Sequence, residues 1–159
     1  STKFANKNGP LFYYSSNEIV EYFDNVIPSS NSVFAEDLMI LGEYLQDTRY
    51  TDLATKAITQ AASSIDIEGV HIANWARLAE AMNFGPYEIA IVGDDALKFS
   101  GYLQQHHLPP SIFLGGKEEN LPLLENKLAA NKTMIYVCKN RTCKLPVDDP
   151  KKALEQIRR

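Results

Sequence analysis

The sequence has little of several features that would define a function class. It contains two cysteines, one tryptophan and three histidines among 159 residues. Lys and Arg together number 16 against 20 Asp and Glu, and no block of like charge stands out. A face that binds nucleic acid needs an excess of basic residues to replace the counterions of phosphate, so we expect no nucleic-acid partner. The same lack argues against a polybasic membrane anchor.

Long apolar runs are also missing. None approaches the roughly 20 residues that a helix needs to cross a bilayer, and no secretory signal is visible. Two cysteines are too few for a disulfide framework. We therefore expect a cytoplasmic protein with no membrane partner. Because the first residue is Ser1 rather than methionine, we also expect a processed or excised chain.

What the sequence does have is apolar content for a packed core, at 45% hydrophobic residues. Residues 1–9 are polar and read as a loose lead-in. Two β-prone runs follow, at 11–14 and 19–23, with a turn-like stretch at 15–18 between them. This pattern predicts a short hairpin, with a helix over 17–24 as the alternative.

Residues 28–85 carry helical periodicity. A first helix is expected from the cap signal at 28–32, with Ser30 or Asn31 as the capping residue, to about Gln46. Asp47 and Thr48 cap a second helix, and a third spans about 70–84 before Gly85 and Pro86 end it. The expected inward residues are Phe34, Leu38, Leu41 and Leu45, widened by Val33, Ile40 and Tyr44; then Tyr50, Leu53, Ala54, Ala57, Ile58, Ala61, Ala62 and Ile65; then Ile72, Trp75, Ala76, Ala79 and Met82.

After Gly85-Pro86 the period changes to that of strands. Strands are expected at 87–92, 111–114 and 133–138, with helices at 96–107, 121–128 and 150–158, the last capped by Asp149. A strand–helix–strand unit places its strands parallel. The expected fold is mixed α/β. Helical hairpins, with a possible N-terminal β-hairpin, occupy 10–85, and a small three-stranded, mostly parallel sheet occupies 86–159.

The polar run Ser30, Asn31 and Ser32, together with Asp24, is the first candidate for a binding pocket. Three hydroxyl or amide groups beside a carboxylate suit a polar ligand, whereas capping of the helix is the alternative that we favour. No Gly-x-Ser-x-Gly turn surrounds the serines, so nothing supports a serine nucleophile. Trp75 belongs to the same candidate because an indole stacks on sugar rings, although its helical spacing favours the core.

Cys138 and Cys143 are the second candidate. Their spacing, with four residues between them, is unlike the Cys-x-x-Cys of redox sites at a helix N-terminus. Structural thiols or a local disulfide are favoured over redox work or metal binding. Zinc takes four ligands, and the spare donors are His71, His106 and His107, so no metal is expected. The turn at 93–95 has one glycine and two acids, unlike a phosphate-binding loop, and no cofactor is expected.

Several motifs occur together in the order seen in one protein family. They are Phe12-Tyr-Tyr, Asp24-Asn-Val-Ile-Pro-Ser-Ser-Asn-Ser-Val, Gly42 with Asp47-Thr-Arg-Tyr, Ile89-Ala-Ile-Val-Gly-Asp, Leu121-Pro-Leu-Leu and Tyr136-Val-Cys-x4-Cys-x2-Pro-Val. The chain after residue 9 resembles the C-terminal region of the thioredoxin-domain-containing family of uncertain activity, also called DUF255 or spermatogenesis-associated-protein-20-like.

This resemblance implies a parent of three parts. They are a thioredoxin-like domain, an (α/α)6 toroid similar to sugar epimerases and glycosidases, and an α/β tail. The present chain then holds the last toroid hairpins and the tail, with no complete catalytic site. Three hypotheses follow: a fragment of a carbohydrate-processing protein with Asp24, Ser30, Asn31 and Ser32 facing the toroid pocket; a non-catalytic module that braces the thioredoxin-like and toroid regions; and a thiol redox element. Loss of toroid neighbours also predicts self-association through the helical half.

Overall fold

The structure is a computed structural model that describes residues 4–63 and 69–158. Its internal contacts divide the chain into two compact units, and each is described by itself. The helical unit contains Ser1–Glu43 and Asp47–Asn83. The α/β unit contains Tyr44–Gln46 and Phe84–Arg159.

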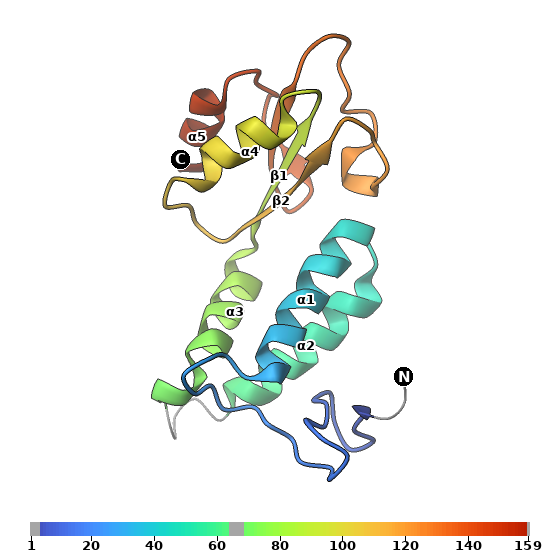
Figure 1. Ribbon diagram of the computed structural model, residues 1–159, viewed down its shortest axis with the longest axis vertical. Helices are drawn as coiled ribbons and strands as arrows, with labels where there is room; N and C mark the ends of the chain where they lie inside the picture. The colour runs from blue at the N-terminus through green and yellow to red at the C-terminus, as the bar shows by residue number, and fades with distance from the viewer. Residues whose placement is uncertain (1–3, 64–68, 159) are drawn as a thin grey trace. The chain divides into compact units, whose positions relative to one another are not determined.

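The helical unit is built on α1 (Ser30–Leu45), α2 (Thr48–Ala62) and α3 (Ala73–Phe84), which is preceded by a 3-10 turn, η2 (Gly69–Ile72) (Figure 1). Helix α2 confirms the predicted stripe, because Ala54, Ala57, Ile58 and Ala61 are buried. The last residue predicted for that stripe, Ile65, lies outside the described residues. The core of the unit consists of Leu11, Ala35, Ala57, Ile58, Ala61, Ile72, Trp75 and Leu78.

Of the predicted inward leucines and phenylalanine of α1, only Leu38 is confirmed. Phe34, Leu41 and Leu45 are about two-fifths exposed, and the buried side of the helix carries Asn31, Ser32, Ala35, Leu38 and Gly42 instead. Gly42 explains part of this choice, since a Cβ built there would lie 2.5 Å from Thr51 Cγ2 of α2. Small and polar residues face inward because α2 packs closely on that side and a polar network, described below, occupies the first turn.

The inward face of α3 also differs from the prediction. Ile72 and Trp75 are buried as expected, but Leu78 and Ala81 complete the face. Ala76 and Met82 are exposed. The helix follows the η2 turn, whose backbone is non-helical at His71, and this changes the helical phase that continuous periodicity over 70–84 would give.

The N-terminal segment forms only the beginning of the predicted hairpin. A single antiparallel bridge joins Tyr13 and Val20, and the Tyr14 N–H donates to the Ile19 carbonyl at 2.7 Å. The alternative helix over 17–24 does not form. The predicted cap of α1 is also corrected: the helix begins at Ser30, and the Oγ of Ser29 accepts the Ser32 N–H at 3.2 Å.

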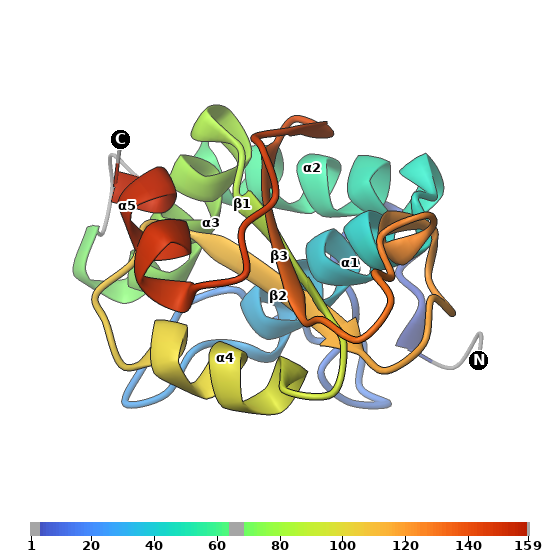
Figure 2. The ribbon, with the colours of Figure 1, turned by 90° about the horizontal axis from the view of Figure 1, so that it is seen from above.

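The α/β unit contains β1 (Tyr87–Val92), α4 (Ala96–Gln104), β2 (Ser111–Gly116), η3 (Pro122–Leu124), β3 (Met134–Lys139), β4 (Thr142–Cys143) and α5 (Pro150–Arg158). Its sheet has four strands in the order β2-β1-β3-β4. Strands β1 and β2 are parallel, whereas β3 runs antiparallel to β1 and β4 antiparallel to β3. Helices α4 and α5 lie together against the strands (Figure 2) and enclose a core around Ile89, Ile91, Leu103, Ile135 and Ile157.

The expectation of a three-stranded, mostly parallel sheet is therefore wrong. Val92 at the end of β1 pairs with Gly116 at the end of β2 and with Met134 at the start of β3. The chain thus leaves β2 and enters β3 at the same end of the strands, because residues 117–133 form a loop with η3 instead of a crossover helix. The fourth strand arises because Asn140 and Arg141, both with positive φ, form a two-residue turn that folds the chain back.

Two glycines permit the close approach of β1, β2 and β3 at this end. A Cβ built at Gly115 would collide with the Ile91 carbonyl oxygen, and one built at Gly93 would lie 2.6 Å from Thr133 Cα. The Gly93 N–H donates to the Gly116 carbonyl at 2.8 Å, which closes the end of the sheet. The turn at 93–95 leads directly into α4, and the side chain of Asp95, its N-cap residue, makes no capping hydrogen bond.

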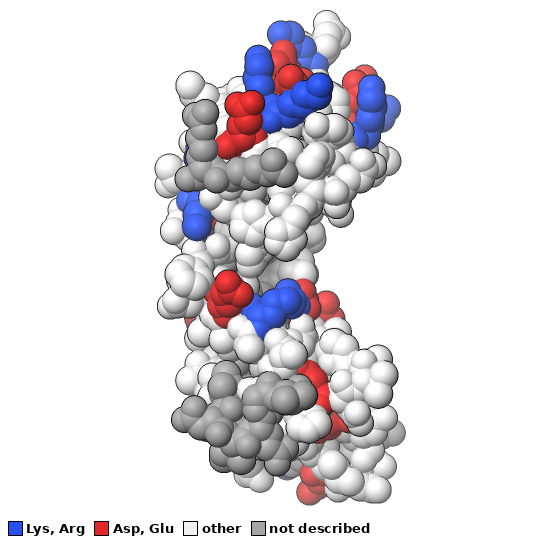
Figure 3. All heavy atoms as spheres, turned by 90° about the vertical axis from the view of Figure 1, so that its left-hand side faces the viewer, with Lys and Arg blue, Asp and Glu red and all other residues white. Residues whose placement is uncertain are grey.

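The described part of the chain holds no helix that is both long and apolar enough to cross a membrane. On the face drawn in Figure 3, basic and acidic side chains lie next to one another instead of forming a field of one sign. Among the described ion pairs, Lys117 lies 2.9 Å from Asp94 and Arg77 lies 2.5 Å from Glu36. This mixture gives the surface drawn there no continuous basic patch for a polyanion.

Candidate functional site

The first predicted site is a buried polar network in the helical unit, centred on Asp24. Asp24 is 7% exposed, and its Oδ1 accepts the Ser29 N–H at 2.9 Å and the Ser32 hydroxyl at 3.2 Å. Its Oδ2 accepts the Asn74 N–H from the first turn of α3 at 2.7 Å. The Asn74 amide also donates to Ser32 Oγ at 3.0 Å. Asp24 therefore ties the segment before α1 to the start of both α1 and α3.

Asn31 extends this connection to the N-terminal segment. Its Oδ1 accepts the Phe12 N–H at 2.7 Å, and its Nδ2 donates to the Phe12 carbonyl at 3.0 Å and the Glu21 carbonyl at 2.6 Å. The side chain is only 4% exposed. Ser30, in contrast, is exposed and makes one long hydrogen bond to Glu21 at 3.3 Å. The structure thus brings Asp24, Asn31 and Ser32 together as internal cross-links and leaves Ser30 outside them.

Trp75 lies in the core of the same unit. The side chain is fully buried, and its Nε1–H donates to the Tyr22 carbonyl at 2.6 Å. The neighbouring recess, of about 420 Å³, is lined by residues 20–25 and His71 and does not include Trp75. The indole therefore packs under the 20–25 segment, where a stacked ligand cannot reach its faces.

A second recess lies at the edge of the sheet where β1 and β2 end. It measures about 630 Å³ and is lined by Gly93, Asp94, Asp95, Lys117 and residues 128–133. This edge is where open α/β sheets bind ligands. Both lysines of its described lining lie near acidic partners, Lys117 Nζ on Asp94 at 2.9 Å and Lys132 Nζ 3.8 Å from Asp148, and the Asp95 N–H donates to Thr133 Oγ1 at 2.9 Å. The described lining therefore offers no unpaired cation to select an anionic ligand.

One wall of that recess is held by Glu119. Its Oε1 accepts the backbone N–H groups of Leu128 and Lys127. The hydrogen bond from Leu128 is the main reason why the pKa of Glu119 lies below its ordinary value, and desolvation opposes it in part. The prediction of a regular helix at 121–128 is wrong, since the short η3 forms there instead. The Glu119 carboxylate supports this loop in its place.

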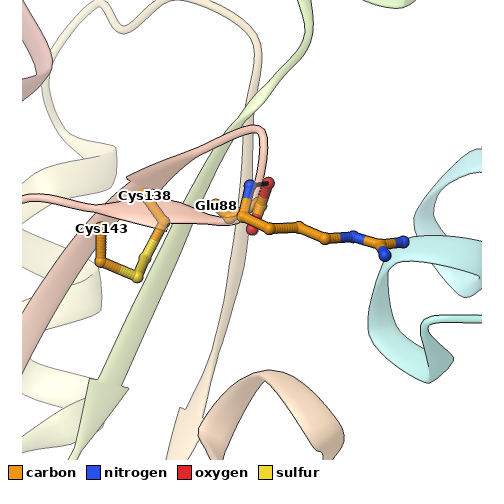
Figure 4. Close-up of a disulfide and its surroundings, with 4 residues drawn as sticks. Glu88, Cys138 and Cys143 are labelled. Carbon is orange, nitrogen blue, oxygen red and sulfur yellow. Dashed lines mark hydrogen bonds between the residues drawn. A yellow bond between two sulfur atoms is a disulfide. The ribbon is translucent and has the colours of Figure 1, made fainter.

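The two cysteines form a disulfide across the β3–β4 hairpin (Figure 4). Cys138 and Cys143 are directly paired in the antiparallel ladder. The Lys144 N–H donates to the Val137 carbonyl at 2.9 Å, so the cysteine pair next to it is a non-hydrogen-bonded pair, in which side chains lie closest. The structure therefore selects the bridged form among the alternatives that the spacing left open.

Glu88 is a residue that the sequence reasoning missed. It is 5% exposed in β1 and lies directly opposite Cys138. Its Oε1 accepts the Arg141 N–H of the hairpin turn at 3.1 Å, and its Oε2 has no hydrogen-bond partner among the described residues. An acid inside the apolar run Tyr87-Glu-Ile-Ala-Ile-Val was the available signal. Ser29 and Asn74 were missed as well, and they carry no comparable signal because both types are common at helix starts.

Within the described residues, no group of three or more His, Cys, Asp and Glu side chains is placed to hold a metal ion. His106 instead lies at the end of α4, where its Nδ1 is 3.0 Å from the Tyr102 carbonyl. No family model, curated protein or solved structure matches this chain.

Proposed function

We propose that this chain is a non-catalytic structural module. The observation that carries the proposal is the Asp24 network, in which each buried polar group of the first candidate site is engaged in holding backbone. A general acid or base must reach the substrate with a free lone pair or proton. Asp24 instead directs both carboxylate oxygens at groups of its own unit. This favours the hypothesis of a non-catalytic module over that of a fragment of a carbohydrate-processing protein.

The network also has a structural purpose. Asp24 and Ser29 close a short loop, and within it the Asn25 N–H donates to the Ile27 carbonyl at 3.0 Å. The loop presents Val26 and Ile27 with exposed fractions of 96% and 74%. Two large apolar side chains held outward on a cross-linked loop suit contact with another protein surface. We assign that surface to the toroid region of the parent that the family resemblance implies.

Saccharide titration and melting together test this function. Wild type and Asp24→Asn should give no binding heat with a panel of monosaccharides and oligosaccharides in calorimetry, while Asp24→Asn lowers the melting temperature because an amide cannot accept all three hydrogen bonds. Ser30→Ala is the matched control, because Ser30 is exposed and should leave melting unchanged. A saccharide that binds wild type and is lost in Asp24→Asn at unchanged melting temperature would overturn the structural proposal in favour of the carbohydrate hypothesis.

A further inference from the structure

The β3–β4 hairpin places its two sulfur atoms in unequal surroundings. Cys138 lies in β3 and is 3% exposed, whereas Cys143 lies in the two-residue edge strand β4 and is exposed. The Thr142 residue beside it is exposed as well, and β3 is the one strand to which the sheet topology pairs β4. Because Cys143 is the exposed residue of the pair and Cys138 the buried one, we expect an incoming nucleophile to reach the sulfur of Cys143 more readily.

A half-satisfied carboxylate lies on the shielded side. Residues directly opposite in an antiparallel pair have Cβ atoms about 4.5–5.5 Å apart on the same face of the sheet. Glu88 and Cys138 are such a pair, and Cys138 is in turn opposite Cys143, so the three side chains form one row across β1, β3 and β4 (Figure 4). Glu88 thus shares a face of the sheet with Cys138; its Oε1 is turned toward the Arg141 N–H, and its Oε2 is buried without a described partner. A buried acid with one unused oxygen is costly unless the position serves another purpose.

We propose that the β3–β4 hairpin is a thiol–disulfide exchange site for a dithiol, that Cys143 Sγ is the sulfur attacked, and that Glu88 slows the exchange by opposing negative charge on Cys138. This inference goes beyond the structural module proposed above and does not depend on it. The partner is defined by its chemistry, as a molecule or protein with two neighbouring thiols.

The reaction proceeds in two steps. A thiolate of the dithiol bonds to Cys143 Sγ, the bond between the two cysteine sulfurs breaks, and its electron pair leaves on Cys138 Sγ, which then takes a proton. The second thiolate of the dithiol attacks the dithiol sulfur of this mixed disulfide and expels Cys143 as a thiolate, which is also protonated. The hairpin gains two electrons and two protons, both supplied by the dithiol, which becomes a disulfide.

The first step depends on how well Cys138 carries negative charge as it leaves. Burial and a neighbouring carboxylate both disfavour a thiolate. The other charged side chains of the hairpin are Lys139, Arg141 and Lys144, and two of them have other partners. Lys139 Nζ lies 5.0 Å from the centre of the Tyr87 ring, and Lys144 Nζ donates to the Gln156 carbonyl at 2.6 Å. Glu88 is the acidic residue that the ladder places directly opposite Cys138.

The site of attack is tested with glutathione, a single thiol, because the mixed disulfide of the first step can be trapped by alkylating the thiol that leaves. The full 159-residue chain is exposed to reduced glutathione, quenched with iodoacetamide and mapped by mass spectrometry. We expect glutathione on Cys143 and the iodoacetamide label on Cys138. Glutathione on Cys138, or an even division between the two, would overturn the assignment of the attacked sulfur. A bridge that does not react even with excess dithiothreitol would overturn the exchange site itself.

The role of Glu88 is tested by Glu88→Gln, whose amide oxygen can still accept the Arg141 N–H. Reduction by dithiothreitol should become several-fold faster, whereas Glu155→Gln, which removes an exposed charge on α5, should leave the rate unchanged. In the reduced protein, the alkylation of Cys138 should shift to lower pH in Glu88→Gln. A hairpin that had merely loosened would alkylate faster at every pH without moving the midpoint, and that result would remove Glu88 from the proposal.

Discussion

Single buried polar side chains connect segments of the helical unit that lack regular structure, and Asn31 is one of them. It bonds to three backbone groups of the segment before α1, at separations of 10 and 19 residues along the chain. Such a side chain supplies hydrogen-bond partners to the backbone of a segment without regular structure, as a neighbouring strand does in a sheet. These partners are needed because buried backbone groups must be hydrogen-bonded. The consequence is that residues 10–28 depend on a few side chains instead of on their own periodicity.

Replacing Asn31 with alanine should therefore destabilise the unit strongly. The Phe12 N–H, the Phe12 carbonyl and the Glu21 carbonyl would lose their partner in a part-buried setting, and we expect a loss of about 2 kcal/mol in the free energy of unfolding. Ser30→Ala, one position away and exposed, should change it little. The emission of Trp75, the single tryptophan and fully buried, reports unfolding in denaturant. Equal midpoints for the two variants would contradict the role given to Asn31.

Two glycines of the α/β unit should respond to replacement by alanine with opposite changes in stability. At Gly115 a Cβ would collide with the Ile91 carbonyl oxygen, so Gly115→Ala should force β1 and β2 apart and lower stability. At Gly101, inside α4, nothing lies within 4 Å of the added Cβ. Gly101→Ala should raise stability by about 0.5–1 kcal/mol through helix propensity. Thermal melting of both variants checks this, and a change of the same sign in both would contradict the close approach at Gly115.

At the scale of elements, the N-terminus of helix α2 is stabilised by its N-cap residue Asp47 and by Arg49. The carboxylate of Asp47 accepts the Arg49 N–H at 3.0 Å and pairs with the Arg49 guanidinium at 2.6 Å. The side-chain hydrogen bond from Arg49 is the main cause that lowers the pKa of Asp47 below its ordinary value of 3.8. A carboxyl group with a depressed folded-state pKa stabilises the fold above 3.8, and this contribution is lost as the pH falls through the folded-state pKa.

The pH dependence of an Asp47→Ala variant follows from the lowered pKa of Asp47. It should melt below wild type at neutral pH, because the N-cap is lost, and the gap between the two should close as the pH falls below 3.8. Asp52→Ala, on the exposed side of the same helix, should show no such convergence. Circular dichroism melting across pH is the measurement. A gap that stays constant through the acid range would show that Asp47 acts by packing and not by its charge.

The elements also differ in how far the sequence predicted them. Helix α2 was predicted with its buried stripe because small alanines recur at helical spacing and nothing polar competes. The inward side of α1 was not, because Asn31, Ser32 and Gly42 are buried by long-range partners that periodicity does not contain. The direction of β3 was missed for a similar reason, since it depends on where the loop 117–133 returns. Of the candidate sites, the cysteine pair was found by composition, whereas the acid in the apolar run 87–92 gains a role only from the position of Glu88 opposite Cys138.

At the scale of the whole molecule, the helical unit leaves part of an apolar stripe on α1 exposed, although Phe34 packs edge-on against Phe12. Val33, Phe34 and Leu41 are between 38% and 42% exposed and lie at spacings that put Phe34 and Leu41 on one side of the helix. Each large apolar side chain left in water forgoes part of the roughly 1.5–3 kcal/mol that full burial would contribute. A second copy of the chain offers the same stripe. A two-fold dimer in which the two α1 helices pack against each other would bury the stripes of both copies.

We therefore expect the chain to self-associate as a two-fold dimer through α1. Light scattering at micromolar concentration should give a mass near twice 17.8 kDa, and the substitution Leu41→Glu should return it to the monomer because a charge would be buried at the interface. Leu97→Glu is the matched control, since Leu97 is a 90% exposed leucine on α4 and its change should leave the dimer intact. A wild-type chain that stays at 17.8 kDa would show that the stripe on α1 is tolerated in water. A dimer that survives Leu41→Glu but not Leu97→Glu would place the interface on the α/β unit instead.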